Sequence, residues 1–262
     1  MERIQQPPVA GVLIGEIECY DFETLCSTPP IPSILITRLI SQWLFPTVRL
    51  TAAAGLLLTS AAGAIDMDRL FASFTKQFKG NPAVFADWKK LAEDGGSGAI
   101  PDKLRRVNEF FNRHIEFSDD LQIWGQSDYW ATPMETLAKG KGDCEDFTIA
   151  KYFTLLKMNV PIESLRLVYV KARIGGPSSG IQQAHMVLTY YPSPDAEPLV
   201  LDNLISEIRP ASRRPDLQPV FSFNSQGLYA GIAANASVGP GGVGQLSRWA
   251  ELLRRSQAEG FD

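Results

Sequence analysis

The hydrophobic pattern of this chain changes at Pro161, and the change limits the folds open to it. Between residues 70 and 157, apolar residues recur near the 3.6-residue period of amphipathic helices. Between residues 165 and 202, short runs rich in Leu, Val and Tyr indicate strands. Helices followed by strands predict an α+β fold, with a helical N-terminal lobe and an antiparallel sheet packed on the last helix.

The elements are placed by periodicity and by turn residues. A helix is expected from about Cys144 to Lys157, largely buried and closed by Pro161. Strands are expected over residues 165–174, 184–191 and 199–202. Three amphipathic stretches precede that helix: Leu70, Phe71, Phe74 and Phe78; Val84, Trp88 and Leu91; Leu104, Val107, Phe111 and His114.

Residues 50–64 have the order of a signal peptide. This run (LTAAAGLLLTSAAGA) is uncharged and apolar, follows Arg38 and Arg49, and ends in the A-x-A pattern of residues 62–64, which predicts cleavage after Ala64. An uncleaved anchor that includes residues 34–50 is the alternative. Residues 1–33 are proline-rich and acidic, unlike a basic leader, which suggests a start site placed too early.

The remainder divides into a catalytic domain and a short tail. We expect the domain to span residues 65–238, and residues 239–262 to form a glycine-rich linker and a helix carrying Leu246, Trp249 and Leu253. The net charge of −4, without a dense basic block, suggests neither nucleic acid nor an anionic membrane surface as partner.

Cleavage after residue 64 would leave Cys144 as the one cysteine of the mature chain, because Cys19 and Cys26 precede it. A lone thiol in an oxidising compartment is either buried and inert, joined to another chain by a disulfide, or used as a reactive group. Cys144 follows Gly140 and Gly142 at a helix start, where free backbone N–H groups and the helix dipole favour a thiolate. It is therefore a candidate nucleophile; the alternative is a small buried apolar residue.

A thiolate nucleophile needs a base, and the chain has two histidines. His114 is in phase with the apolar face of its helix, which predicts a partly buried structural role. His185 lies within a strand and needs a polar partner, which makes it the candidate base; a structural histidine is the alternative. A hairpin loop centred between Ser193 and Pro194 places Asp202 directly opposite, with Cβ atoms about 5 Å apart. Asp202 is thus predicted to orient the base, although it is also an ordinary strand-end residue.

These residues predict acyl transfer, with the backbone N–H of Cys144 as one oxyanion donor and the Trp130 indole as an option for a second. Asp143, Glu145 and Asp146 crowd the thiol with negative charge, which raises its pKa. They are explained either by favourable charge in the first helical turn, with Asp143 as N-cap, or by a bound Ca²⁺.

The chain resembles the bacterial transglutaminase-like cysteine proteinases over about residues 65–230. The resemblance rests on Trp130 to Pro133, Gly140 to Asp146 (GKGDCED), Ala184 to Leu188 and Leu201 to Asn203. It implies a papain-like, transglutaminase-type core, a triad of Cys144, His185 and Asp202, and Ca²⁺ on Asp143 and Glu145 with Asp146.

The same resemblance implies a periplasmic endopeptidase that cuts the N-terminal region of a large surface adhesin after paired alanines, so that the cell leaves the biofilm. It further implies inhibition by the periplasmic domain of an inner-membrane cyclic-di-GMP receptor. A transglutaminase-like acyltransferase and a non-enzymatic binding module remain as alternatives from the residues themselves.

Overall fold

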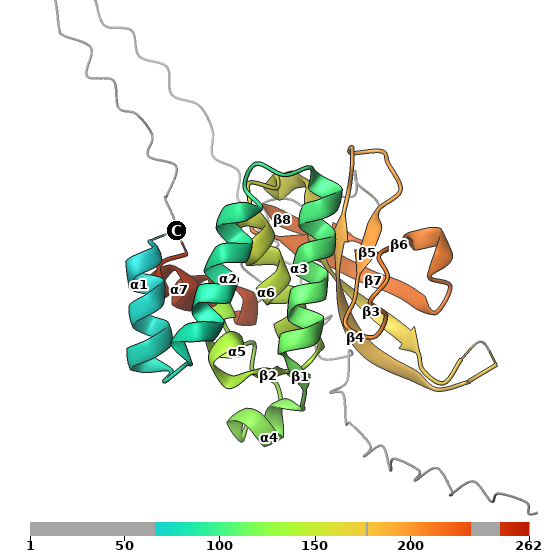
Figure 1. Ribbon diagram of the computed structural model, residues 1–262. Helices are drawn as coiled ribbons and strands as arrows, with labels where there is room; N and C mark the ends of the chain where they lie inside the picture. Colours follow the sequence, from blue (N-terminus) through green and yellow to red (C-terminus); the bar gives the residue numbers. More distant parts are fainter. Residues whose placement is uncertain (1–65, 177, 232–246, 262) are drawn as a thin grey trace, which may run out of the picture. The chain divides into compact units, whose positions relative to one another are not determined.

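The computed structural model describes residues 66–176, 178–231 and 247–261 (Figure 1). The described residues belong to one compact unit, residues 61–262. The expected signal peptide, Cys19, Cys26 and the glycine-rich run at 239–244 lie outside the described residues. Within the described ranges, no helix has both the length and the apolar character of a membrane span.

The predicted helical character of the first half is confirmed. The α-helices are α1 Met67–Ala72, α2 Pro82–Asp94, α3 Ile100–His114, α4 Asp120–Trp124, α5 Pro133–Lys139, α6 Cys144–Lys157 and α7 Ser247–Glu259. Helix α1 continues into a π-helical turn, η2 Ser73–Gln77, and two 3₁₀ turns are η3 Ile162–Ser164 and η4 Ala211–Arg213. Helix α6 has the predicted bounds, Cys144 to Lys157.

The second half forms a six-stranded antiparallel sheet in the order β6-β5-β4-β3-β7-β8. Its strands are β3 Leu165–Arg173, β4 Gln182–Tyr190, β5 Leu199–Leu201, β6 Arg209–Pro210, β7 Leu217–Asn224 and β8 Gly227–Ala230. The first three match the predicted strands. The other three were not predicted, and β7 extends the sheet on the side of β3 opposite β4.

Helix α6 contacts helix α3 and strands β3 and β4 of the sheet. Its central residues are almost wholly removed from solvent, including Ile149, Tyr152 and Leu155. Trp88, Phe111 and Trp249 from other helices belong to the same core. Because α6 is packed on several sides, its first turn has a fixed position against β4.

The register of β4 and β5 differs from the predicted one. Leu188 lies opposite Leu201 and Tyr190 opposite Leu199, so the connecting loop is centred one residue later than predicted. Extending this register places Asp202 opposite Val187 rather than opposite His185. The difference is two positions, and because side chains alternate along a strand, an even shift keeps the two side chains on one face.

His114 also differs from its prediction. It is exposed at the last position of α3, where its Nδ1 lies 2.8 Å from the Phe110 carbonyl oxygen and its ring stacks on Phe110. Leu104, Val107 and Phe111 are buried as expected. The apolar face of α3 therefore stops one turn before the helix does.

Candidate active site at the start of helix α6

The two glycines before Cys144 have distinct structural roles. Gly140 ends α5 in the left-handed region, with φ of 63°. The next residues form β2 (Lys141–Gly142), which pairs in parallel with β1 (Glu116–Phe117). A Cβ on Gly142 would lie 2.7 Å from the Cβ of Asp146, so this approach requires glycine. Gly140 and Gly142 thus allow the short connection between the end of α5 and the first turn of α6.

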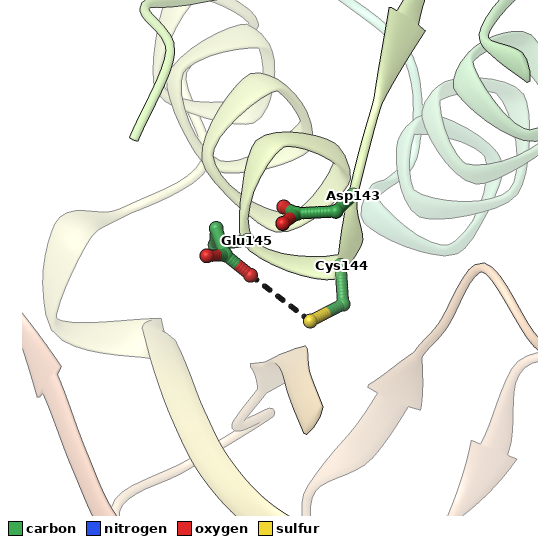
Figure 2. Close-up of side chains that lie close together, drawn as sticks. All are labelled: Asp143, Cys144 and Glu145. Carbon is green, nitrogen blue, oxygen red and sulfur yellow. Dashed lines mark hydrogen bonds between the residues drawn. The ribbon is translucent and has the colours of Figure 1, made fainter. Parts of the chain in front are cut away.

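The Cys144 side chain is partly buried, and its thiol donates to Glu145 Oε2 at 3.0 Å (Figure 2). Burial raises the pKa of the Cys144 thiol, and the neighbouring charges of Glu145 and Asp143 raise it further. This geometry therefore favours the protonated, less reactive thiol.

His185 and Asp202 form the predicted pair. The buried imidazole donates from Nε2 to Asp202 Oδ1 at 2.8 Å. Leu204 N donates to the same oxygen, and buried Arg214 donates to Asp202 Oδ2 at 2.7 Å. Burial alone would raise the pKa of Asp202, but these hydrogen bonds and the positive charges hold it well below its usual range. Asp202 is thus an anion that fixes the ring of His185.

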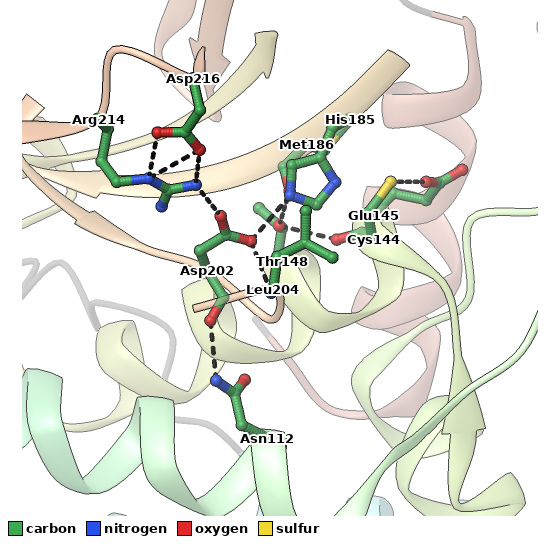
Figure 3. Close-up of polar contacts among 10 residues, drawn as sticks. All are labelled: Asn112, Cys144, Glu145, Thr148, His185, Met186, Asp202, Leu204, Arg214 and Asp216. Atoms are coloured by element: carbon green, nitrogen blue, oxygen red, sulfur yellow. Dashed lines mark hydrogen bonds and ion pairs between the residues drawn. The ribbon is translucent and has the colours of Figure 1, made fainter. Parts of the chain in front are cut away.

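Thr148 connects the nucleophile helix to the strand of the base. Its hydroxyl lies 2.9 Å from the carbonyl oxygen of Cys144 and 3.1 Å from that of Met186. Figure 3 shows the second ring nitrogen of His185, Nδ1, directed toward the Cys144 sulfur. The thiol hydrogen bond goes to Glu145 rather than to this nitrogen.

The acidic residues near the thiol form a larger cluster than the sequence predicted. Asp143, Glu145 and Asp146 are joined by Asp120 of α4 and by Asp128 from the following loop. Ligand atoms lie within 4.8 Å of one another in three overlapping groups: Asp143, Cys144 and Glu145; Asp120, Asp128 and Glu145; Asp120, Asp143 and Asp146.

Several oxygens of this acidic cluster are buried without a hydrogen-bond partner among the described residues. They are Asp120 Oδ1, Asp128 Oδ1, Asp143 Oδ1 and Asp146 Oδ2. Burial raises the pKa of Asp120 to about 7, with Glu145 and Asp128 adding to the rise against a hydrogen bond from Tyr129. Burial and then the charge of Glu145 likewise raise the pKa of Asp143 and of Asp146. The oxygens are suited to a proton or a cation.

Two details of the predicted site need correction or completion. Asp143 occupies the N-cap position of α6, but its side chain accepts no capping hydrogen bond from the described backbone. The indole of Trp130 stacks on Phe223, with ring centroids 5.8 Å apart, and no hydrogen bond among the described residues supports its predicted role as an oxyanion donor. Capping therefore does not account for Asp143, and the second oxyanion donor is left unassigned.

The fold and site define a class of protein: an α+β protein with a cysteine at the start of a buried helix, facing a histidine and an aspartate on an antiparallel sheet. Residues 96–215 match the family model described as bacterial transglutaminase-like cysteine proteinase. No protein of curated description matches the chain.

Solved structures of LapG from Legionella pneumophila are similar to this chain. One is 35% identical with a TM-score of 0.61, and the match covers 74% of this chain and 99% of that one. An EGTA-treated form is 35% identical, with a TM-score of 0.62 and coverage of 74% and 100%. A calcium-bound form is 38% identical, with a TM-score of 0.56 and coverage of 71% and 98%.

The chain therefore belongs to the bacterial transglutaminase-like cysteine proteinase family, of the LapG type. Membership confirms the predicted α+β, transglutaminase-type fold and the predicted cysteine proteinase class.

The acidic cluster predicts a pH-dependent stability of the metal-free protein. Because burial raises the pKa of Asp120 to about 7 in the folded state, that state retains a proton that the unfolded chain releases between about pH 4 and 7. Its contribution to the free energy of unfolding therefore falls as the pH rises through that window. Asp120→Asn, which cannot ionise, should flatten the fall of melting temperature with pH in EGTA.

The matched control is Asp102→Asn, since Asp102 is exposed on α3. This variant should follow the wild-type curve. Parallel curves for wild type and Asp120→Asn would contradict the assignment of a raised pKa to Asp120.

Proposed function

We propose that this protein is a periplasmic, calcium-dependent cysteine endopeptidase that cuts the N-terminal region of a large surface adhesin. The observation that carries the proposal is the placement of the Cys144 thiol at the start of α6, facing the ring of His185, which is held by Asp202 (Figure 3).

The hydrogen bond between His185 and Asp202 supports the proton positions that acyl transfer needs. In the neutral imidazole, donation from Nε2 to Asp202 leaves Nδ1 unprotonated, so that Nδ1 can accept the thiol proton. The Cys144 sulfur then attacks a peptide carbonyl, and His185 returns the proton to the leaving amine. Water, deprotonated by the same imidazole, releases the acyl group and restores the thiol. Asp202 keeps the ring in the required tautomer.

The acidic cluster fits a hard divalent cation. It offers carboxylate oxygens from Asp120, Asp128, Asp143, Glu145 and Asp146, some of them buried without a partner among the described residues, and oxygen is the ligand that Ca²⁺ prefers. A bound Ca²⁺ would supply positive charge that lowers the pKa of the nearby thiol. One of the similar structures is a calcium-bound form of Legionella LapG, which supports the same ligand here.

Glu145 has two competing uses in this proposal. Its carboxylate accepts from the Cys144 thiol, and it also belongs to two of the three groups of possible ligands. When Glu145 is engaged as a ligand, its charge no longer holds the thiol proton, and Nδ1 of His185 is the remaining acceptor. The calcium requirement then follows from the position of one carboxylate.

The substrate, location and regulation are proposed from the sequence and the family. The run at residues 50–64 supports export to the periplasm. Membership of the LapG-type family supports a large surface adhesin as substrate, with its release promoting biofilm dispersal. It also supports capture and inhibition by the periplasmic domain of an inner-membrane cyclic-di-GMP receptor.

We predict that Cys144→Ala abolishes cleavage, because no other described side chain occupies the nucleophile position. The N-terminal fragment of a large adhesin from the same genome is incubated with each protein in calcium, and products are separated by mass. The rate should fall more than about a thousandfold. Asp102→Asn, an exposed substitution on α3 that leaves Cys144 in place, is the control and should cleave normally.

Residual cleavage by Cys144→Ala would place the nucleophile elsewhere. A heavier, crosslinked product formed by the wild-type protein would instead indicate acyl transfer to an amine.

We predict that Asp143→Asn and Glu145→Gln each weaken Ca²⁺ binding at least about tenfold, measured by calorimetry on EGTA-stripped protein. Each substitution removes a charge from the acidic cluster and leaves the side-chain volume nearly unchanged. Asp102→Asn, an exposed acid on α3, is the control and should bind like wild type. Unchanged affinity in both cluster variants would refute the proposed ligands.

A further inference from the structure

Helix α7 (Ser247–Glu259) follows the region matched by the family model, which ends at residue 215. One face of α7 is anchored in the core by Trp249 and Leu252, both fully buried. Trp249 packs edge-on against Phe223 and Tyr152. The helix therefore has a fixed position, from which other side chains of α7 reach the loop at residues 128–132.

Arg255 of α7 holds this loop and the adjoining Glu135 through both terminal nitrogens of its guanidinium group. Nη2 donates to the carbonyl oxygen of Trp130 at 2.5 Å, and Nη1 donates to Glu135 Oε2 at 2.6 Å and to the Tyr129 hydroxyl at 3.0 Å. The guanidinium also lies over the Tyr129 ring, 4.7 Å from its centre. A planar fork of donors makes such a set of contacts, whereas a lysine ammonium cannot.

Two further side chains of α7 contact the same segment. Buried Glu259 accepts from the Thr132 hydroxyl at 2.9 Å. Arg248 pairs with Asp128 at 2.8 Å, although its side chain is 57% exposed and the pair is therefore weak. Arg255 is 16% exposed and makes the larger set of contacts, so we assign the principal role to Arg255.

The loop held by Arg255 contributes to the acidic cluster in two ways: it carries one candidate ligand, and it donates a hydrogen bond to another. Asp128, at its start, is one of the candidate ligands. Ala131 N donates to Asp146 Oδ1 at 2.8 Å, which fixes the orientation of a second carboxylate. Trp130, whose carbonyl binds Arg255, lies between these two residues. Displacement of the loop would therefore move one ligand and release another.

We propose that Arg255 is a positioning residue for the cation site, acting through residues 128–131, so that α7 sets the calcium affinity of the protease. The inference rests on the proposed calcium dependence. It assigns to the C-terminal helix a role in the active site, although none of its residues belongs to the acidic cluster or to the proposed triad.

The test is calcium calorimetry on EGTA-stripped Arg255→Gln, Arg255→Lys and Arg254→Gln, with melting curves recorded in EGTA. Arg254 is the matched control, because it is exposed on the same helix. Arg255→Gln should weaken Ca²⁺ binding about tenfold or more, and the calcium concentration for half-maximal cleavage should rise in parallel. Arg255→Lys, which keeps the charge and loses the fork, should be intermediate.

Wild-type affinity in Arg255→Gln, with a lowered melting temperature, would mean a structural role alone and would overturn the proposal. If Arg255→Gln fails to fold, wild-type affinity in Arg255→Lys has the same force. Absence of calcium binding by the wild-type protein would overturn the proposed calcium dependence itself, and this inference with it.

Discussion

Negative charge is concentrated beside the Cys144 sulfur in this protein, because helix α4, the loop after it and the start of helix α6 bring their carboxylates together there. Asp120 from α4, Asp128 from the next loop, and Asp143, Glu145 and Asp146 at the start of α6 form overlapping groups of carboxylates, of which Asp143 and Glu145 lie beside the Cys144 thiol. Burial and mutual repulsion make full ionisation of such a cluster costly. The cluster must therefore hold protons or a cation, and each choice sets a different state of the thiol.

The opposite side of the site has the reverse electrostatics. Asp202 lies between His185 and Arg214, and its pKa is depressed, whereas burial and Glu145 raise the pKa of Asp143 and Asp146. Environments that separate the pKa values of neighbouring acids are typical of sites that divide acid, base and structural roles among carboxylates. Here one aspartate supports the base as an anion, and the others are available to a metal. Helix α6 and strand β4 bring the two sides together.

Much of this arrangement was predictable from local sequence. The bounds of α6 follow from the glycines before it and Pro161 after it. The pairing of His185 with Asp202 was predicted with a register in error by two, and the prediction held because an even error preserves the face. The predicted burial of His114 was wrong, because the phase of a residue on a helix does not tell whether the end of that helix extends into solvent. The strands β7 and β8 carried no alternation clear enough to be recognised.

Contacts between segments that are far apart in the sequence could not be predicted from local patterns. Asp120 on α4 and Asp128 in the loop after it carry no motif of their own, and only the fold brings them to Glu145. Arg255 is still farther away along the sequence, because 126 residues separate it from Tyr129 and 120 separate it from Glu135.

If charge in the acidic cluster controls the thiol, the state of the cluster must be visible in the reactivity of Cys144. The most direct measurement is alkylation of Cys144 by iodoacetamide against pH, read on its peptide by mass spectrometry, in calcium and in EGTA. We expect a midpoint about one pH unit or more lower in calcium; equal midpoints would contradict control of the thiol by the cluster.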